Sequence, residues 1–219
     1  MKIGVICEGH ADRAVITNII TGITGLDRSN ILALRPTNKS DETDKAFKNP
    51  KSISSWSVIK EECEKKELIN EFLAIEGQDF VVIHIDTAEA GSYGVNSPNK
   101  KSDNYCENIR SLVVGKINDW LVTDLSKSIL YAVAVEEIDA WVLTIYEQGD
   151  SSKPANPKKQ LSRVLAKKDL DSTSNYNNYL ILSNPLSKQR EITKNNYLSY
   201  NCSLKAFHDE VKTKVLPLL

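Results

Sequence analysis

Residues 80–86 read FVVIHID, and this stretch decides the fold expected for the 219-residue chain. Its apolar residues run almost continuously instead of alternating with polar ones, which is typical of a strand covered on both faces. Such strands belong to parallel sheets with helices on either side. The run ends at Asp86, a charged residue. We therefore expect residues 80–85 to form a buried strand of an α/β domain.

Other segments extend this pattern in both directions along the chain. Short apolar runs predict three further strands, at residues 2–7 (KIGVIC), 31–34 (ILAL) and 129–135 (ILYAVAV). Helical spacing and capping residues predict helices over 14–23, 57–75, 103–121 and 136–146. The polar segments 37–55 and 87–101 are expected to be loops. Strands that alternate with helices form βαβ units with a mostly parallel sheet.

The amino-acid composition of the chain changes after residue 147. Residues 148–219 are rich in Ser, Asn, Lys and Pro, and helical stretches are expected at 157–168 and 203–216. We predict an α/β domain over residues 1–147 and a small helical C-terminal appendage over residues 148–219 that packs on it.

Composition excludes several classes of protein. With a net charge of −1 and 26% charged residues, the chain is neither low-complexity nor disordered. No window approaches the ~18 to 20 consecutive apolar residues of a membrane span, so a cytoplasmic protein without a membrane partner is expected.

The four cysteines are Cys7, Cys63, Cys106 and Cys202. They are too widely spaced in the sequence for zinc-binding pairs, and we expect reduced, mostly packed thiols.

Acidic side chains follow three of the four expected strands. They are Glu8 and Asp12 after the first, Asp86 and Glu89 after the third, and Glu136, Glu137 and Asp139 after the fourth. Ligands of open parallel sheets gather at the carboxyl ends of the strands, so these acids are expected to converge. Cations would relieve their repulsion, and an all-oxygen set suits Mg²⁺ or Mn²⁺. For Glu89 and Glu137 taken singly, a role at a helix N-terminus is the competing interpretation.

Basic side chains cluster in residues 151–168, which carry a charge of +6 and no acid. Lys158, Lys159 and Arg163 are the candidates for binding nucleic-acid phosphates. A solvated helix face explains the same pattern, and both interpretations stay open. His84, within the third strand, is expected to be buried structure.

The motifs around these acids resemble those of the Toprim fold of topoisomerases, primases and overcoming-lysogenization-defect nucleases. Glu8-Gly9 matches the Glu-Gly that follows the first Toprim strand. Residues 86–91 (DTAEAG) stand where the family has Asp-x-Asp-x-x-Gly, and Asp12 matches an acid found in the nuclease branch. The resemblance implies a Toprim-like sheet flanked by helices.

A closer resemblance is to a little-characterised group of Toprim-like proteins linked to phage defence. Residues 139–141 (DAW), 157–158 (PK) and 203–207 (SLKAF) stand where that group has Glu-Ala-Trp, Pro-Lys and Ser-x-x-x-Phe. The resemblance covers nearly the whole chain. It implies a Mg²⁺-dependent nuclease that cleaves DNA or RNA as a component of an anti-phage system. A separate ATPase partner fits the lack of a Walker-type loop, and self-association of the chain is left open.

The resemblance also assigns roles to residues. It implies that Glu8 and Asp86 are catalytic and that Lys158 contacts phosphate. The family's catalytic and metal-binding roles are carried to Glu8 and Asp86 only. The second-rank candidate metal ligands are Asp12, Glu89, Glu136, Glu137 and Asp139. Two positions depart from the family pattern, because Ala88 replaces the second Asp and Asp139 replaces a Glu.

Two other functions compete with the nuclease. One is a catalytically degenerate Toprim-like module that binds nucleic acid or a partner ATPase, and Ala88 favours it. The other is a metal-dependent phosphohydrolase on a similar sheet, which would place an Asp nucleophile where this chain has Glu8.

Overall fold

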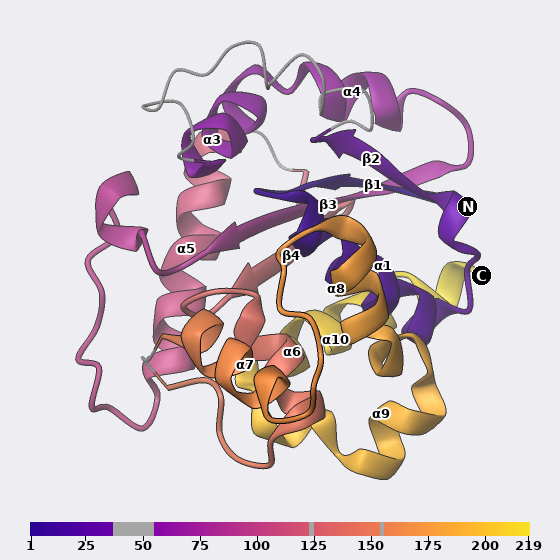
Figure 1. Cartoon of the computed structure of the whole chain (residues 1–219). Helices are drawn as coiled ribbons and strands as arrows, with labels where there is room; N and C mark the ends of the chain where they lie inside the picture. The colour runs from indigo at the N-terminus through magenta and orange to yellow at the C-terminus, as the bar shows by residue number, and fades with distance from the viewer. Residues whose placement is uncertain (37–54, 123–124, 154–155) are drawn as a thin grey trace, which may run out of the picture.

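A four-stranded, all-parallel sheet with the strand order β2-β1-β3-β4 runs through the molecule (Figure 1). The computed structural model describes residues 1–36, 55–122, 125–153 and 156–219. The strands are β1 (Lys2–Ile6), β2 (Ile31–Arg35), β3 (Gln78–Asp86) and β4 (Ile129–Ala134). The predicted α/β fold with a parallel sheet is therefore confirmed.

The buried strand β3 lies between β1 and β4 and is hydrogen-bonded to both. Phe80 and Val82 enter the core on one face of the sheet, whereas Val81 and Ile83 enter the core on the other. All four side chains are at most 4% exposed. The continuous apolar run in the sequence thus reflects a strand whose two faces are both covered by helices.

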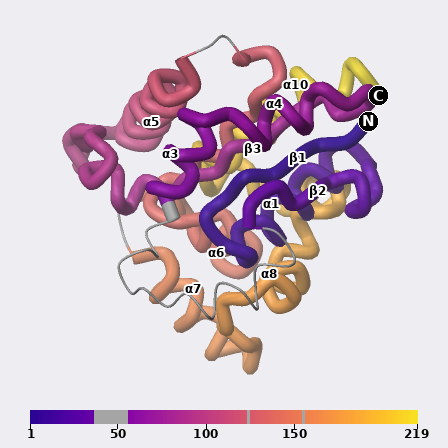
Figure 2. Tube along the Cα trace, turned by 90° about the horizontal axis from the view of Figure 1, so that it is seen from above, coloured from indigo at the N-terminus to yellow at the C-terminus, as the bar shows by residue number. Residues whose placement is uncertain are grey.

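Helices cover both faces of the sheet, as Figures 1 and 2 show. One face carries α3 (Ser55–Lys65), α4 (Glu67–Leu73) and α5 (Tyr105–Leu121). The opposite core is completed by α1 (His10–Thr24), α6 (Asp139–Tyr146), α7 (Pro157–Ala166), α8 (Tyr176–Leu182), α9 (Gln189–Asn195) and α10 (Cys202–Lys214). Short 3₁₀ turns are η1 (Arg28–Asn30), η2 (Ala90–Tyr93), η3 (Asn184–Ser187), η4 (Tyr197–Tyr200) and η5 (Leu216–Leu218).

The C-terminal helices pack directly on the N-terminal part of the chain. Helix α8 and the turn η3 lie against α1, and α10 lies against α1 and β4. The amide of Asn18 on α1 donates to the carbonyl of Leu180 and to the hydroxyl of Ser183. A Cβ added at Gly22 would lie 2.2 Å from the carbonyl oxygen of Leu186, so α1 and η3 are in backbone contact. The predicted boundary at residue 147 stays a prediction.

Some elements differ from the sequence-based expectation. The single helix expected over residues 57–75 is two helices, because Lys66 adopts the left-handed conformation with a φ of 58° between α3 and α4. Helices α8 and α9 were not expected. The loop expected over residues 37–55 lies outside the described residues up to residue 54. In the described ranges, no helix combines the length and apolarity needed to cross a membrane.

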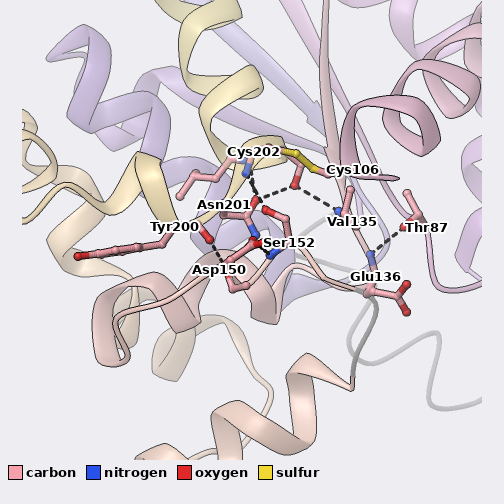
Figure 3. The surroundings of a disulfide bond; sticks show 12 residues. Thr87, Cys106, Val135, Glu136, Asp150, Ser152, Tyr200, Asn201 and Cys202 are labelled. Atoms are coloured by element: carbon pink, nitrogen blue, oxygen red, sulfur yellow. Dashed lines mark hydrogen bonds between the residues drawn. A yellow bond between two sulfur atoms is a disulfide. The ribbon is translucent and has the colours of Figure 1, made fainter. Parts of the chain in front are cut away.

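The cysteines divide into two kinds. Cys7 and Cys63 are free and buried, as expected. The expectation of reduced thiols is wrong for Cys106 and Cys202, which form a disulfide between α5 and α10 (Figure 3). They are 96 residues apart in sequence, yet the fold brings their Cα atoms to 6.5 Å, within the range that a disulfide bridges. The separation of two cysteines in the sequence does not indicate whether the fold brings them close together.

Candidate active site

A cleft of about 1200 Å³ lies at the carboxyl ends of β1, β3 and β4. Its lining includes five of the seven acids that follow those strands, namely Glu8, Asp12, Asp86, Glu137 and Asp139. Parallel neighbouring strands end at the same edge of the sheet, which is why residues far apart in sequence gather here. The described fold therefore brings most of the predicted acidic set into one cleft.

Glu8 and Asp86 are held together by the pairing of β1 with β3. The carboxylate oxygen Oε1 of Glu8 accepts a hydrogen bond of 3.1 Å from the backbone N–H of Asp86. The hydroxyl of Tyr93 donates to the carbonyl oxygen of Asp86 at 3.0 Å. These bonds fix the backbone of Asp86 at the floor of the cleft.

Asp12 lies in the first turn of α1, where its Oδ2 accepts a hydrogen bond of 2.7 Å from the backbone N–H of Gly9. Burial, together with the charges of Asp86 and Glu8, raises the pKa of Asp12 to about 7, while His84 acts in the opposite direction. A carboxyl with this pKa exchanges its proton near neutral pH.

The side chain of Asp86 is a buried acid among other acids, and a hydrogen bond from the backbone of Ile138 favours its charged form. Burial raises its pKa well above the ordinary value, and Glu8, Asp139 and Glu137 add to the rise through repulsion. Its Oδ1 is buried and makes no hydrogen bond. A cation or a proton is needed to balance this group.

His84 is the residue of this site that sequence reasoning assigned to structure alone. Its ring is fully buried, with Nδ1 at 3.9 Å from Asp12 Oδ2 and Nε2 at 3.3 Å from Asp86 Oδ1. Neither nitrogen makes a hydrogen bond of good geometry. The signal that would have found it is its position two residues before Asp86, because alternate residues of a strand point to the same face.

Helix α6 and its neighbours position the two acids that follow β4. Asp139 Oδ1 accepts a hydrogen bond from the hydroxyl of Tyr179 on α8, and burial raises the pKa of Asp139. Glu137 Oε2 accepts a hydrogen bond of 3.3 Å from the backbone N–H of Lys158. Burial, followed by the charge of Asp139, raises the pKa of Glu137. The C-terminal helices thus complete the site.

Two of the predicted acids lie elsewhere. Glu136 is not part of the cleft lining, and its Oε1 accepts from the hydroxyl of Tyr105 at 3.1 Å and lies 3.9 Å from Lys100 Nζ. Glu89 is exposed at the start of η2 and does not line the cleft either. Ala88, at the position of the missing Asp, is also exposed and outside the lining.

The three predicted basic residues lie together on α7. Lys158 lines the carboxylate cleft and also a shallower cleft of about 420 Å³, which Lys159 and Arg163 line as well. The side chain of Asn156 caps the helix by accepting from the backbone N–H of Lys159. The exposed cations Lys158, Lys159 and Arg163 therefore line a cleft that shares Lys158 with the carboxylate cleft.

Comparison with protein-family models, curated proteins and solved structures gave no significant match. The sheet order 2-1-3-4 with flanking helices is compatible with the Toprim-like fold that the sequence motifs resemble.

The donor chemistry of the cleft fits a hard divalent cation. Its carboxylates are crowded, and Oδ1 of Asp86 is buried without a hydrogen bond, 3.3 Å from His84 Nε2. In the part of the chain that the structure describes, no three His, Cys, Asp or Glu side chains form a group that would hold a metal as they stand. Ligation therefore requires a change of side-chain rotamer.

Proposed function

We propose that this protein is a divalent-metal-dependent nuclease of the Toprim-like type. The observation that carries the proposal is the convergence of Glu8, Asp86 and Asp139, from three strand ends, in one cleft that also exposes Lys158. Repulsion among this many carboxylates at one sheet edge destabilises the folded protein unless cations bind to them. The adjoining basic surface suits a polyanionic substrate.

The residues have separate roles in this proposal. Glu8, Asp86 and Asp139 would hold Mg²⁺ or Mn²⁺, which when bound supplies a nucleophilic hydroxide and stabilises the leaving oxygen. Asp12, with its pKa near 7, takes or gives a proton at neutral pH. Lys158 holds a phosphate beside the acids, and Lys159 and Arg163 bind the phosphates that follow along the strand.

The resemblance to phage-defence proteins supports a role in such a system, with DNA or RNA as substrate and a separate ATPase as partner. A degenerate binding module is the second candidate. Ala88 in place of an acid favours it, as does the lack of a preformed three-ligand group among the described residues. It would bind nucleic acid through α7 without cleaving it.

The test is incubation of the purified protein with plasmid, single-stranded DNA and transfer RNA in Mg²⁺ and in Mn²⁺. Glu8→Gln removes charge while it keeps volume, and we expect it to lower cleavage by about 100-fold or more. Glu89→Gln is the matched control, because Glu89 is exposed outside the cleft and its loss should leave cleavage unchanged.

Equal cleavage by wild type and Glu8→Gln would refute the nuclease assignment. Binding of nucleic acid by a wild-type protein that cleaves none of the substrates in either metal would favour the degenerate module instead.

A further inference from the structure

The disulfide joins the first turns of two long helices. Cys106 is the second residue of α5, which has 17 residues, and Cys202 is the first residue of α10, which has 13. Figure 3 shows the bond beside the end of β4 and the turn that follows it. Through this bond, α5 on one face of the sheet is tied to α10 on the other.

The residues next to each cysteine hold the turn between β4 and α6. Tyr105 donates to the carboxylate of Glu136, at 3.1 Å. The hydroxyl oxygen of Ser203 accepts from the backbone N–H of Val135 at 3.3 Å and from the indole N–H of Trp141 at 2.8 Å. The same hydroxyl donates to Asn201, which caps α10. The disulfide therefore lies next in sequence to two residues, Tyr105 and Ser203, whose hydrogen bonds reach Val135, Glu136 and Trp141.

That turn presents two acids to the carboxylate cleft. Glu137 lies within it, and Asp139 is the first residue of the helix that follows. A change in how α5 and α10 hold the turn would move the side chains that face the substrate.

The bond lies in the wall of a second cleft. Cys106 and Cys202 both line this cleft of about 830 Å³, which is separate from the acidic one; Cys202 is partly exposed, whereas Cys106 is 5% exposed. The charged lining residues of this cleft are the lysines Lys100, Lys101, Lys153 and Lys205 and the acids Asp103, Glu107 and Asp150. Each cysteine lies in the first turn of its helix, where the positive end of the helix dipole stabilises a leaving thiolate.

We propose that Cys106–Cys202 is a thiol–disulfide exchange site for a low-molecular-weight thiol, and that its reduction loosens the turn at residues 135–138. A thiolate attacks one sulfur, forms a mixed disulfide and expels the other cysteine as a thiolate, which takes up a proton. A second thiol attacks the mixed disulfide, releasing the second cysteine thiol and the oxidised small-molecule disulfide. Two electrons and two protons pass to the protein. The consequence for cleavage rests on the proposed function, whereas reduction and loosening do not.

The test uses the full-length native protein and glutathione as the thiol. Alkylation followed by mass spectrometry measures the fraction of reduced Cys106 and Cys202, and hydrogen–deuterium exchange measures the protection of residues 135–141. Reduction under native conditions should speed exchange in this segment roughly tenfold or more, the effect of losing one or two hydrogen bonds. Residues 15–23 of α1 should keep their protection.

Two variants complete the design. Cys106→Ser with Cys202→Ser should show the exchange pattern of the reduced wild type with or without glutathione. Cys63→Ser, which alters a buried free thiol on α3, should respond to glutathione as wild type does. A disulfide that is reduced only in denaturant would overturn the proposal, as would unchanged exchange after reduction.

A rise in exchange throughout the described helices would also overturn it, because that result marks global unfolding. If the protein never folds with both serines, the reduced wild type still decides between these outcomes. A protein that is reduced and loosened as expected but cleaves no nucleic acid would contradict the proposed function and leave this inference standing.

Discussion

The carboxylate of Asp86 is both buried and repelled by neighbouring acids in the cleft. It is surrounded by Glu8, Glu137 and Asp139, and its buried Oδ1 makes no hydrogen bond. Desolvation and like charges both favour its protonated form. In the metal-free protein the cleft therefore destabilises the fold, and the same crowding gives a divalent cation its attraction.

The sign of the pH dependence follows from these raised pKa values. Asp12 has a pKa of about 7 when folded and 3.8 ordinarily, so the folded state binds more protons than the unfolded state between those values. The stabilisation from this group is complete below about pH 4 and is lost as the pH rises towards 7. We predict that the metal-free wild type has a lower free energy of unfolding at pH 8 than at pH 5.

Asp86→Asn should weaken this dependence, since it removes a charge that raises the pKa of Asp12. At pH 8 we expect the variant to be more stable than wild type, because the substitution removes a buried carboxylate that neighbouring acids repel. Urea unfolding at several pH values measures the free energy of unfolding of both proteins.

The response to metal is a separate measurement. Mn²⁺ at roughly ten times its Kd should raise the Tm of wild type by a few degrees and raise that of the variant only slightly. A variant less stable than wild type at pH 8 would mean that Asp86 has a structural role.

At the level of elements, the close approach of α1 to η3 gives a stability test. The added methyl of Gly22→Ala would meet the backbone of Leu186 and Ser187, which has no rotamer to change. We expect a loss of about 1–3 kcal/mol from overpacking. Gly115→Ala on α5 is the matched control. Nothing lies within 4 Å of its added carbon, and it should gain about 1 kcal/mol from helix propensity.

Thermal or urea unfolding of both variants gives the comparison. Two substitutions of the same kind should thus shift stability in opposite directions. If Gly22→Ala were as stable as Gly115→Ala, the packing of η3 on α1 would have to be revised.

Helix α7 offers a test of the basic surface. Lys158→Glu with Lys159→Glu should weaken nucleic-acid binding and flatten its salt dependence, since each lost phosphate contact lowers the log–log slope by roughly 0.9 on duplex DNA. Lys167→Glu with Lys168→Glu is the control of equal charge, because these exposed residues line neither cleft. Fluorescence anisotropy at several salt concentrations measures the slopes.

Equal slopes for the two double variants would assign α7 to a solvated surface with no specific role. A change with the control pair alone would place the nucleic-acid path at the far end of the helix.

The strands and most of the acids were predictable because they depend on local pattern. A strand buried on both faces has a continuous apolar run, and strand order then brings Glu8 and Asp86 to one edge. Helices α8 and α9 were not predictable, because each has only seven residues, and their sequences, YNNYLIL and QREITKN, acquire helical structure by packing on other elements.

The side-chain contacts made by those helices could not be predicted from the sequence either. The partner of Asp139 is Tyr179, on the unpredicted α8. Adjacent acids also separate in ways that the sequence does not indicate. Glu136 has a φ of 63° and faces Tyr105, whereas Glu137 enters the cleft. The turn conformation that separates them depends on Thr87, whose hydroxyl accepts from the backbone N–H of Glu136.

At the scale of the whole molecule, the site and the core depend on both ends of the described chain. Helix α1 follows the first strand, and its outer surface is covered by α8, η3 and α10. Tyr179 from α8 and Lys158 from α7 complete a cleft whose floor is made by the strand ends. The acids are therefore held in place only when the C-terminal helices have docked.

The docking of the C-terminal helices on α1 affects how the chain folds during synthesis. During synthesis α1 leaves the ribosome long before its cover, since the chain must grow from residue 24 to residue 182 before α8 is complete. At about 5–20 residues per second, that interval is roughly 10–30 s. For that period the apolar side of α1, including Ile16, Ile19 and Ile20, has no native partner from α8 or α10. We therefore expect the yield of folded protein in cells to depend on how fast translation passes through the C-terminal third.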